Sequence, residues 1–255
     1  SGLQAIAMAA GRIVAEGVPA MIAGGVESIS QIRSRSATDS GDSGMDPWIV
    51  EHKPELYLSM IETADIVAAR YGIGREAQDR FSAESQRKTE AAQAAGRYRD
   101  EIVSVTTTMA VTDKETKAVT QRTATVDIDT CNRRGTTYEA LAKLEPVMGA
   151  GKFVTAGNAS QLSDGASACV MVEAREAERL GLKPLGAFRG LALAGCEPDE
   201  MGIGPVFAVP KLLARHGLKV DDIGLWELNE AFASQALYCQ QRLGIPDERL
   251  NVNGG

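Results

Sequence analysis

The sequence has little cysteine, little histidine and no long apolar run. Its four cysteines, Cys131, Cys169, Cys196 and Cys239, are far apart and form no CxxC pair. This spacing argues against a zinc site and against a dense disulfide framework. We interpret all four as inert reduced thiols, because a buried free cysteine behaves as a small hydrophobic residue.

No apolar stretch approaches the roughly 18 residues needed to cross a bilayer. The residues after Ser1 also lack the charged-then-apolar pattern of a secretion signal. We therefore expect a cytoplasmic protein, or one whose organelle address has been removed. The formal net charge of -7 argues against a general affinity for nucleic acid or acidic lipid, although a local basic pocket is compatible with it.

Aromatic residues make up only 5% of the 255 residues, whereas 44% are hydrophobic and 24% are charged. This composition is typical of an ordinary globular protein. The length suits one large or two ordinary domains, since a domain usually has about 100–200 residues. Of the two histidines, His216 precedes Gly217 in a pattern typical of a helix end, so we assign it a structural role.

Helix and strand patterns alternate in the first part of the chain and return later. Apolar residues recur at helical spacing from Leu3 to Gly17, and the apolar run at 20–26 is typical of a strand covered on both faces. A second buried strand is predicted at 166–172, followed by a helix at 173–180. Helices next to buried strands indicate a layered α/β architecture.

The segment from Ile29 to Leu162 differs and is interpreted as a mixed α+β insertion. Its residues 30–55 are mostly polar, which predicts a segment that leaves the core. Helices are predicted at 61–71 and 76–95, and strands at 102–109 and 123–128.

After residue 184 the layered pattern resumes. We expect strands at 185–194 and 223–228, and helices at 206–216 and 229–243. Layers on both sides of the insertion permit two similar halves, although their similarity is too weak to demonstrate a duplication.

The most specific local motif is WELNEAFASQ at 226–235, where a predicted strand passes into a helix. Asn229 at this corner has two alternative roles. Its side chain could cap the helix by accepting a backbone N–H bond. Alternatively it could project from the end of the strand into a crevice and hold a water or a substrate oxygen. The residues alone leave both alternatives open.

A second motif is the small-residue loop TAGNAS at 155–160, followed by SDGA at 163–166. Such a loop lets a ligand approach the backbone, but a plain turn explains the same residues. Met60 and Met201 suit either an acyl pocket or simple core filling, since methionine adapts to irregular apolar surfaces. Arg133, beside Arg134, could pair with phosphates or belong to an ordinary exposed pair.

The sequence NEAFA at 229–233 resembles the thiolase motif whose asparagine positions a water in an oxyanion hole. The match extends through SGLQA at 1–5, AGGVES at 23–28 and NVNGG at 251–255, and so covers essentially the whole chain. NEAFA favours a true thiolase over ketoacyl synthases, whose corresponding residue is typically histidine. A lipid-carrier homologue of the thiolases is a further alternative. LSMIE at 58–62 departs from the family, since many members have a histidine or proline before Met-Gly, and this leaves the acyl-chain preference open.

The resemblance implies that Asn229 is catalytic, because a fixed amide stabilises the negative oxygen that develops in acyl transfer or enolate formation. Ser160 corresponds to a residue that hydrogen-bonds the pantetheine arm of coenzyme A, in a segment that includes Ala159. Phe232 corresponds to an aromatic residue of the acyl pocket, although core packing explains it equally well. The other residues expected to bind substrate are Met201 near the thioester, Met60, which matches a methionine of the family's insertion, and Arg133 near the phosphates.

The implied architecture is a thiolase fold of two similar layered α/β halves with a mixed α+β loop-domain insertion. The N-terminal half would comprise residues 1–28 and 163–184, the loop domain residues 29–162, and the C-terminal half residues 185–255. Both halves are expected to be incomplete within this sequence.

The implied reaction is reversible Claisen condensation, or thiolysis of a 3-ketoacyl-CoA, through a cysteine acyl-enzyme. Coenzyme A would be substrate and carrier, with no tightly bound cofactor, no metal, and a homodimer or homotetramer as the assembly. The family's reactive cysteine precedes the Ser-Gly-Leu segment, and its histidine and second cysteine follow Asn-Gly-Gly. All three would fall outside residues 1–255, so a truncated noncatalytic acyl-CoA-binding protein is the alternative.

Overall fold

The computed structural model describes residues 1–31 and 44–255 and opens with a helix and a strand, as predicted. Helix α1 (Gly2–Glu16) ends at Gly17, whose left-handed conformation (φ 70°) suits a residue without Cβ. Strand β1 (Ala20–Glu27) follows directly. The presence of a helix and then a strand in this part of the chain is confirmed.

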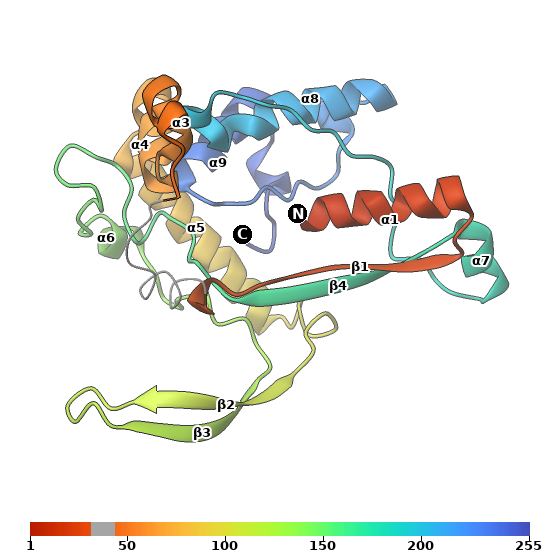
Figure 1. The fold of residues 1–255 in the computed structure, drawn as a ribbon, viewed down its shortest axis with the longest axis horizontal. Coiled ribbons are helices and arrows are strands. Elements are labelled where there is room, and N and C mark those ends of the chain that lie inside the picture. Colours follow the sequence, from red (N-terminus) through yellow and green to blue (C-terminus); the bar gives the residue numbers. More distant parts are fainter. Residues whose placement is uncertain (32–43) are drawn as a thin grey trace.

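Strand β1 pairs with strand β4 (Gly165–Val172) in an antiparallel two-stranded ribbon (Figure 1). Ala20 lies opposite Val172, so the ribbon joins segments that are far apart in the sequence. A Cβ atom at Gly24 would lie 2.9 Å from the carbonyl oxygen of Ser167, and glycine therefore permits the close approach of the two strands.

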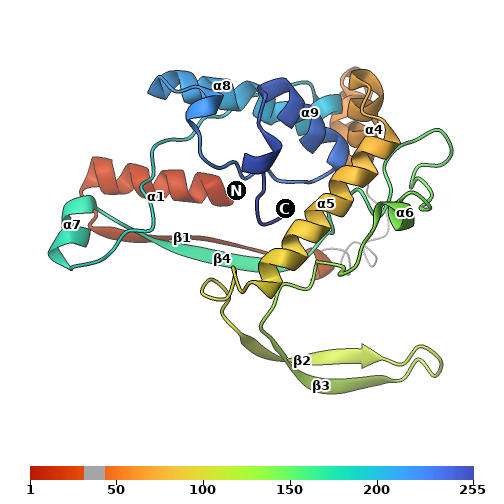
Figure 2. The same cartoon turned by 180° about the vertical axis from the view of Figure 1, so that it is seen from behind.

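The expectation that these strands are covered on both faces is wrong for the described residues. Ile22, Val26 and Val170 have exposed fractions of 72%, 81% and 69%. Helix α1 packs along one side of the ribbon, and α7 (Ala174–Arg179) follows at its end (Figures 1 and 2). An apolar run favours a strand, but only a second covering layer would bury its other face.

The segment between β1 and β4 contains both helices and strands, as expected. Strands β2 and β3 form an antiparallel hairpin that projects from the body of the molecule (Figures 1 and 2), with bounds shifted from those predicted. The elements are α3 (Pro47–His52), α4 (Met60–Tyr71), α5 (Arg75–Ala94), β2 (Val105–Thr112), β3 (Val119–Val126) and α6 (Tyr138–Leu141).

The polar excursion expected at 30–55 is only partly within the structure, because 32–43 lie outside the described residues. Its later part forms α3 instead of a loop. The Asp46 carboxylate accepts N–H bonds from Trp48 and Ile49, and Pro47 occupies the first turn. An acidic cap followed by proline is a helix start, which the polar composition concealed.

Helix α8 (Gly204–His216) ends at Gly217 as predicted, and α9 (Ala233–Leu243) lies beside it. The strand expected at 185–194 is wrong. Side chains of α8 bind this segment instead, since Lys211 Nζ and Arg215 Nη1 donate to the carbonyl oxygens of Leu193 (2.9 Å) and Leu191 (2.8 Å). No described strand pairs with it.

The strand expected at 223–228 is also wrong, because it is reduced to a single parallel bridge between Trp226 and Leu250. The Trp226 N–H donates to the Arg249 carbonyl (2.8 Å), and the Asn251 N–H donates to the Trp226 carbonyl (2.9 Å). Arg249 Nη1 also binds the carbonyl oxygen of Ile223 (3.1 Å). The Arg249 side chain thus binds the Ile223 carbonyl, which a neighbouring strand would bind if the pairing extended further.

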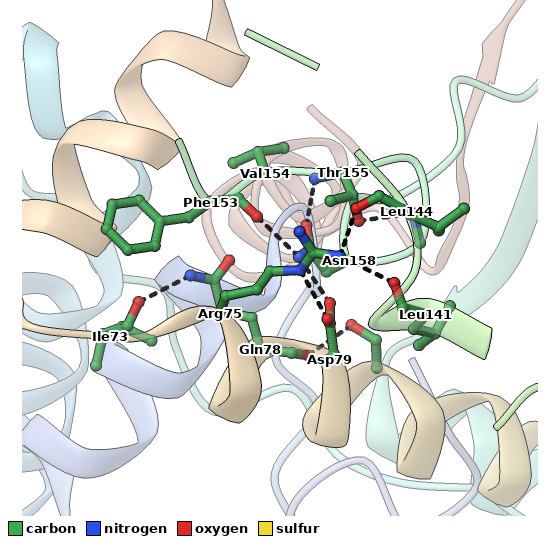
Figure 3. A network of polar contacts seen from close by, with 12 residues as sticks. Ile73, Arg75, Gln78, Asp79, Leu141, Leu144, Phe153, Val154, Thr155 and Asn158 are labelled. Carbon is green, nitrogen blue, oxygen red and sulfur yellow. Dashed lines mark hydrogen bonds and ion pairs between the residues drawn. The ribbon is translucent and has the colours of Figure 1, made fainter. Parts of the chain in front are cut away.

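A buried polar network fixes the loop at 153–158 to α5 (Figure 3). Asn158 Nδ2 donates to Asp79 Oδ1 (3.0 Å) and to the Phe153 carbonyl (3.1 Å), while Asn158 Oδ1 accepts the Thr155 N–H (2.8 Å). Asp79 is fully buried and Asn158 is only 2% exposed. Both groups therefore depend on protein partners, because water cannot replace a lost bond there.

Two further side chains strengthen this attachment. Arg75 Nε donates to Asp79 Oδ2 at 2.6 Å, and Arg75 Nη2 donates to the Leu141 carbonyl at 2.9 Å. On α4, the buried Asp65 carboxylate accepts the N–H groups of Phe153 (2.8 Å) and Val154 (3.0 Å). The loop is therefore held from α4 and α5, and Arg75 also ties α5 to the end of α6.

We predict that Asp79→Ala lowers the free energy of unfolding by about 3 kcal/mol, because it leaves Arg75 and Asn158 without their shared partner. Glu76→Ala is the matched control: its ion pair with Arg80 lies on the exposed face of α5, and its loss should cost less than about 1 kcal/mol. Urea unfolding of both variants measures the difference. Equal losses would contradict the structural role given to Asp79.

Candidate functional site

The two motifs singled out in the sequence lie side by side. The Ser160 N–H donates to the Ala231 carbonyl (2.9 Å), and the Ala233 N–H donates to the Asn158 carbonyl (3.0 Å). Between these bonds Ala159 and Phe232 form an antiparallel bridge. The small-residue loop and the corner after Leu228 are therefore one structural unit.

A cavity of about 560 Å³ opens beside this unit. Its walls come from α5, from the segment before α6, from the small-residue loop and from the backbone of Gly254 and Gly255. Lining residues that matter for its chemistry are Gln86, Cys131, Arg133, Ala159, Ser160 and Glu230.

Three of the predicted site residues, Arg133, Ala159 and Ser160, line this cavity together. Asn229 does not line it, but the next residue, Glu230, does. The cavity wall likewise excludes the remaining three predicted residues, which are Met60, Met201 and Phe232. The structure therefore brings together the residues expected near coenzyme A and leaves the expected acyl-pocket residues outside the cavity.

Asn229 is exposed and precedes the helix instead of capping it. Helix α9 begins at Ala233, with Phe232 at the N-cap in an extended conformation (φ -144°). Gln235 fixes the corner, because its Oε1 accepts the Phe232 N–H (3.1 Å) and its Nε2 donates to the Asn229 carbonyl (3.3 Å). The alternative in which Asn229 caps the helix is wrong.

The segment that carries Arg133 is anchored to α5 through two backbone N–H groups and the Asn132 side chain. The Arg133 N–H and Asn132 Nδ2 both donate to Gln86 Oε1, at 2.8 Å and 2.9 Å, and the Gly135 N–H donates to Glu90 Oε2 at 3.1 Å. The Arg133 side chain is exposed and makes no ion pair within residues 1–31 and 44–255. Its charge is therefore available to a ligand.

Gly157 in the small-residue loop allows neighbouring leucine side chains to pack closely against the backbone. A Cβ at Gly157 would lie 2.5 Å from Leu141 Cδ2 and 2.7 Å from Leu144 Cδ1. The adjacent Ser160 Oγ makes only a long bond, 3.3 Å, to the Gln161 carbonyl. Close packing explains the glycine, whereas the weakly bonded serine hydroxyl on the cavity wall is free to turn toward a ligand.

Met201 sits in the short 3-10 helix Pro198–Ile203, whose acidic residues are held by α4. Arg70 donates to Asp199 Oδ2 and to Glu200 Oε2, both at 2.6 Å. The bond from Arg70 to Asp199 holds the pKa of that carboxyl below its usual value. Met201 and Met60 are 52% and 48% exposed, so neither fills the core of the described structure. Both methionines thus lie on exposed surface outside the cavity.

The cysteines differ in their surroundings. Burial raises the pKa of Cys239 to about 12 and also raises that of Cys196, which keeps both thiols protonated. This fits the interpretation of inert thiols. Cys169, in contrast, is exposed, and Cys131 lines the cavity with its Sγ 3.1 Å from Ser163 Oγ.

Neither histidine belongs to the cavity wall. His52 stacks on Trp48 with ring centroids 4.4 Å apart, and a Cβ at Gly190 would lie 2.8 Å from His216 Nε2. The described residues also hold no group of three His, Cys, Asp or Glu side chains suited to a metal ion, and no helix long and apolar enough to cross a membrane.

Sequence reasoning missed two residues of this site, Glu230 and Asn251. Glu230 borders the cavity, and Asn251 Nδ2 donates to Glu230 Oε1 at 2.7 Å. Only their places in the sequence could have drawn attention to them, since Glu230 follows Asn229 and Asn251 lies in the NVNGG segment. Nothing in the sequence indicated that these two segments meet.

Comparisons with known proteins identify the family. The family described as thiolase, N-terminal domain, matches residues 1–175, and the family described as thiolase, C-terminal domain, matches residues 182–255. The 3-ketoacyl-CoA thiolase of Bacillus subtilis is 43% identical over all of this chain and 64% of its own length. The acetyl-CoA acetyltransferase of Chromobacterium violaceum is 42% identical, with 65% of its length covered.

Solved structures give the same result. The dimeric peroxisomal thiolase of Saccharomyces cerevisiae superposes on all of this chain with a TM-score of 0.85 at 32% identity, over 62% of its own chain. Human mitochondrial 3-ketoacyl-CoA thiolase gives a TM-score of 0.82 at 33% identity, over 64% of its chain.

The chain thus spans 64% of the length of the Bacillus relative and 62% of the yeast structure. Within that span both family matches are continuous and together leave only a few residues between them. The chain belongs to the thiolase family and has the α/β thiolase fold.

Proposed function

We propose that the protein is a thiolase that transfers acyl groups between coenzyme A thioesters, by condensation or by thiolysis of a 3-ketoacyl-CoA. The observation that carries this proposal is the union of the Asn229 corner with the small-residue loop at the edge of one cavity. The names of the relatives, 3-ketoacyl-CoA thiolase and acetyl-CoA acetyltransferase, support the same reaction class.

Coenzyme A would occupy the cavity as substrate and carrier. The unpaired Arg133 at the wall can bind a phosphate through charge-assisted hydrogen bonds. The Ser160 hydroxyl, with only a 3.3 Å internal bond, can turn to a polar group of the pantetheine arm beside the small Ala159. No tightly bound cofactor is needed, because the carrier itself supplies the thioester.

The exposed Asn229 amide would hold a water or a thioester oxygen at the edge of the cavity. Gln235 fixes the Asn229 backbone, so the amide acts from a rigid corner, and a preorganised donor favours the oxygen on which negative charge develops. Phe232, Met60 and Met201 stay proposed acyl-group contacts, for substrates whose acyl chain extends beyond this cavity. The acyl-accepting cysteine and the base expected from the family are not among the described cavity residues.

We also propose the three-part division of the chain, into 1–28 with 163–184, 29–162 and 185–255. Pairing of β1 with β4 across the intervening segment supports it. A homodimer or homotetramer is proposed as the assembly, since the yeast neighbour is described as dimeric. The cytoplasmic location stays a prediction, because some relatives are named peroxisomal.

The intact native protein should convert one acetoacetyl-CoA and one coenzyme A into two acetyl-CoA. Loss of the acetoacetyl-CoA enolate absorbance, with chromatography of the products, measures this turnover. Binding of acetoacetyl-CoA without turnover, by a protein whose intact mass equals the 27.0 kDa of these residues, would contradict the proposal and favour a noncatalytic acyl-CoA-binding protein.

Asn229→Ala should lower kcat of thiolysis by about 10²–10³-fold, because one preorganised donor to the developing oxyanion is lost, with a smaller change in KM. Gln241→Ala removes another exposed amide, on the far part of α9, and serves as the control. A kcat for Asn229→Ala within about threefold of the wild type would exclude this role.

Arg133→Gln should raise KM for coenzyme A thioesters about tenfold and change kcat less, because a charge-assisted phosphate contact is lost. Arg134→Gln is the matched control, since its neighbouring side chain is exposed but does not line the cavity. The difference should shrink at high salt, where exposed charges are screened. Equal KM values for the two variants would argue against a phosphate at Arg133.

A further inference from the structure

The side chain of Asn251 occupies the place of a missing strand residue. Its Oδ1 accepts the Leu228 N–H at 2.8 Å, and its Nδ2 donates to the Leu228 carbonyl at 2.8 Å. The backbone pairing itself consists only of the bridge between Trp226 and Leu250, just before the residues that this side chain joins. The carboxamide therefore extends the pairing by one residue, with the same donor and acceptor that a peptide group would offer.

The local backbone aims the carboxamide at this position. Asn251 has a left-handed conformation (φ 43°), which asparagine tolerates better than most residues, and only 2% of it is exposed. A Cβ at Gly255 would lie 2.6 Å from Asn251 Nδ2, so the chain closes tightly over the amide. Water cannot replace these bonds at such a site.

The same amide also contacts the cavity wall. Asn251 Nδ2 donates to Glu230 Oε1 at 2.7 Å, and Glu230 borders both the cavity of about 560 Å³ and a neighbouring one of about 600 Å³. Asn229 lies between the two residues that Asn251 binds, Leu228 and Glu230. One buried side chain thus fixes the backbone before Asn229 and the carboxylate after it.

We propose that Asn251 is a positioning residue for the Asn229 corner: its carboxamide binds Leu228 and Glu230 and sets the direction in which the Asn229 amide leaves the backbone after Leu228. The link to catalysis rests on the proposed thiolase function. The link to the backbone does not, since it concerns hydrogen bonds that are measurable without turnover.

The backbone arm of the test uses Asn251→Gly, which removes the amide and accepts the left-handed conformation without strain. Hydrogen exchange of the Leu228 amide, followed by NMR, should accelerate at least about tenfold relative to the wild type, while the amide of residue 251, bound to the Trp226 carbonyl, keeps its protection. An unchanged Leu228 exchange rate would overturn the proposal.

The catalytic arm uses Asn251→Asp, which keeps the shape but replaces the donor by a carboxylate facing the Leu228 carbonyl and Glu230. We expect kcat to fall about 10- to 100-fold with KM nearly unchanged, because a small misorientation of a catalytic group is costly. Asn253→Asp, the same change two residues on, is the control and should leave kcat nearly unchanged. Its side chain makes no hydrogen bond among the described residues.

A double variant separates positioning from general destabilisation. In Asn251→Asp/Glu230→Gln the donor and acceptor are exchanged, so kcat should recover at least partly from the value of Asn251→Asp, whereas Glu230→Gln alone should have a smaller effect. No recovery in a folded double variant would overturn the part of the proposal that concerns Glu230, since the aspartate introduced at position 251 still faces the Leu228 carbonyl. A wild-type protein without turnover would refute the thiolase function, and hydrogen exchange at Leu228 would still decide the role of Asn251.

Discussion

The pairing of Asp79 with Asn158 is the interaction on which the site depends. Asn158 carries the loop that bonds to the Asn229 corner, and Asp79 fixes Asn158 to the longest helix of the described structure. Both side chains are buried, so the attachment has a defined geometry and a high cost of being broken. Arg75 balances the buried charge of Asp79 through its Nε, and its Nη2 donates to the carbonyl oxygen of Leu141, the last residue of α6.

The same physical device recurs at Asn251. In both asparagines the amide oxygen accepts a backbone N–H and the amide nitrogen donates to a backbone carbonyl, so one side chain does the work of a short stretch of strand. Aspartate cannot replace either of them, because it lacks the donor. These side-chain bonds make the loops rigid in a region that has little β-sheet. A preorganised acyl-transfer site requires such rigid loops.

These attachments explain which of the predicted site residues line the cavity and which lie outside it. Arg133, Ala159 and Ser160 come together because Gln86 and Asp79, both on α5, hold their segments on one side of the cavity. Met201 is held by a different contact, the bonds from Arg70 to Asp199 and Glu200, and lies outside the cavity. Membership of the family indicated which residues matter, but each was placed by a side chain that no motif names.

The sequence by itself determined the helices α1, α4, α5, α7, α8 and α9, the strands β1 and β4, the helix ends at Gly17 and Gly217, and the family, because these follow from local periodicity, glycine conformation and short motifs. It did not determine α3, whose start is hidden in a polar segment. It could not determine whether 185–194 and 223–228 become strands, since a strand needs a partner that local residues do not specify. Only the tertiary structure decided that Asn251 meets Leu228 and Glu230, because that contact joins residues more than twenty positions apart through hydrogen bonds that have no periodicity in the sequence.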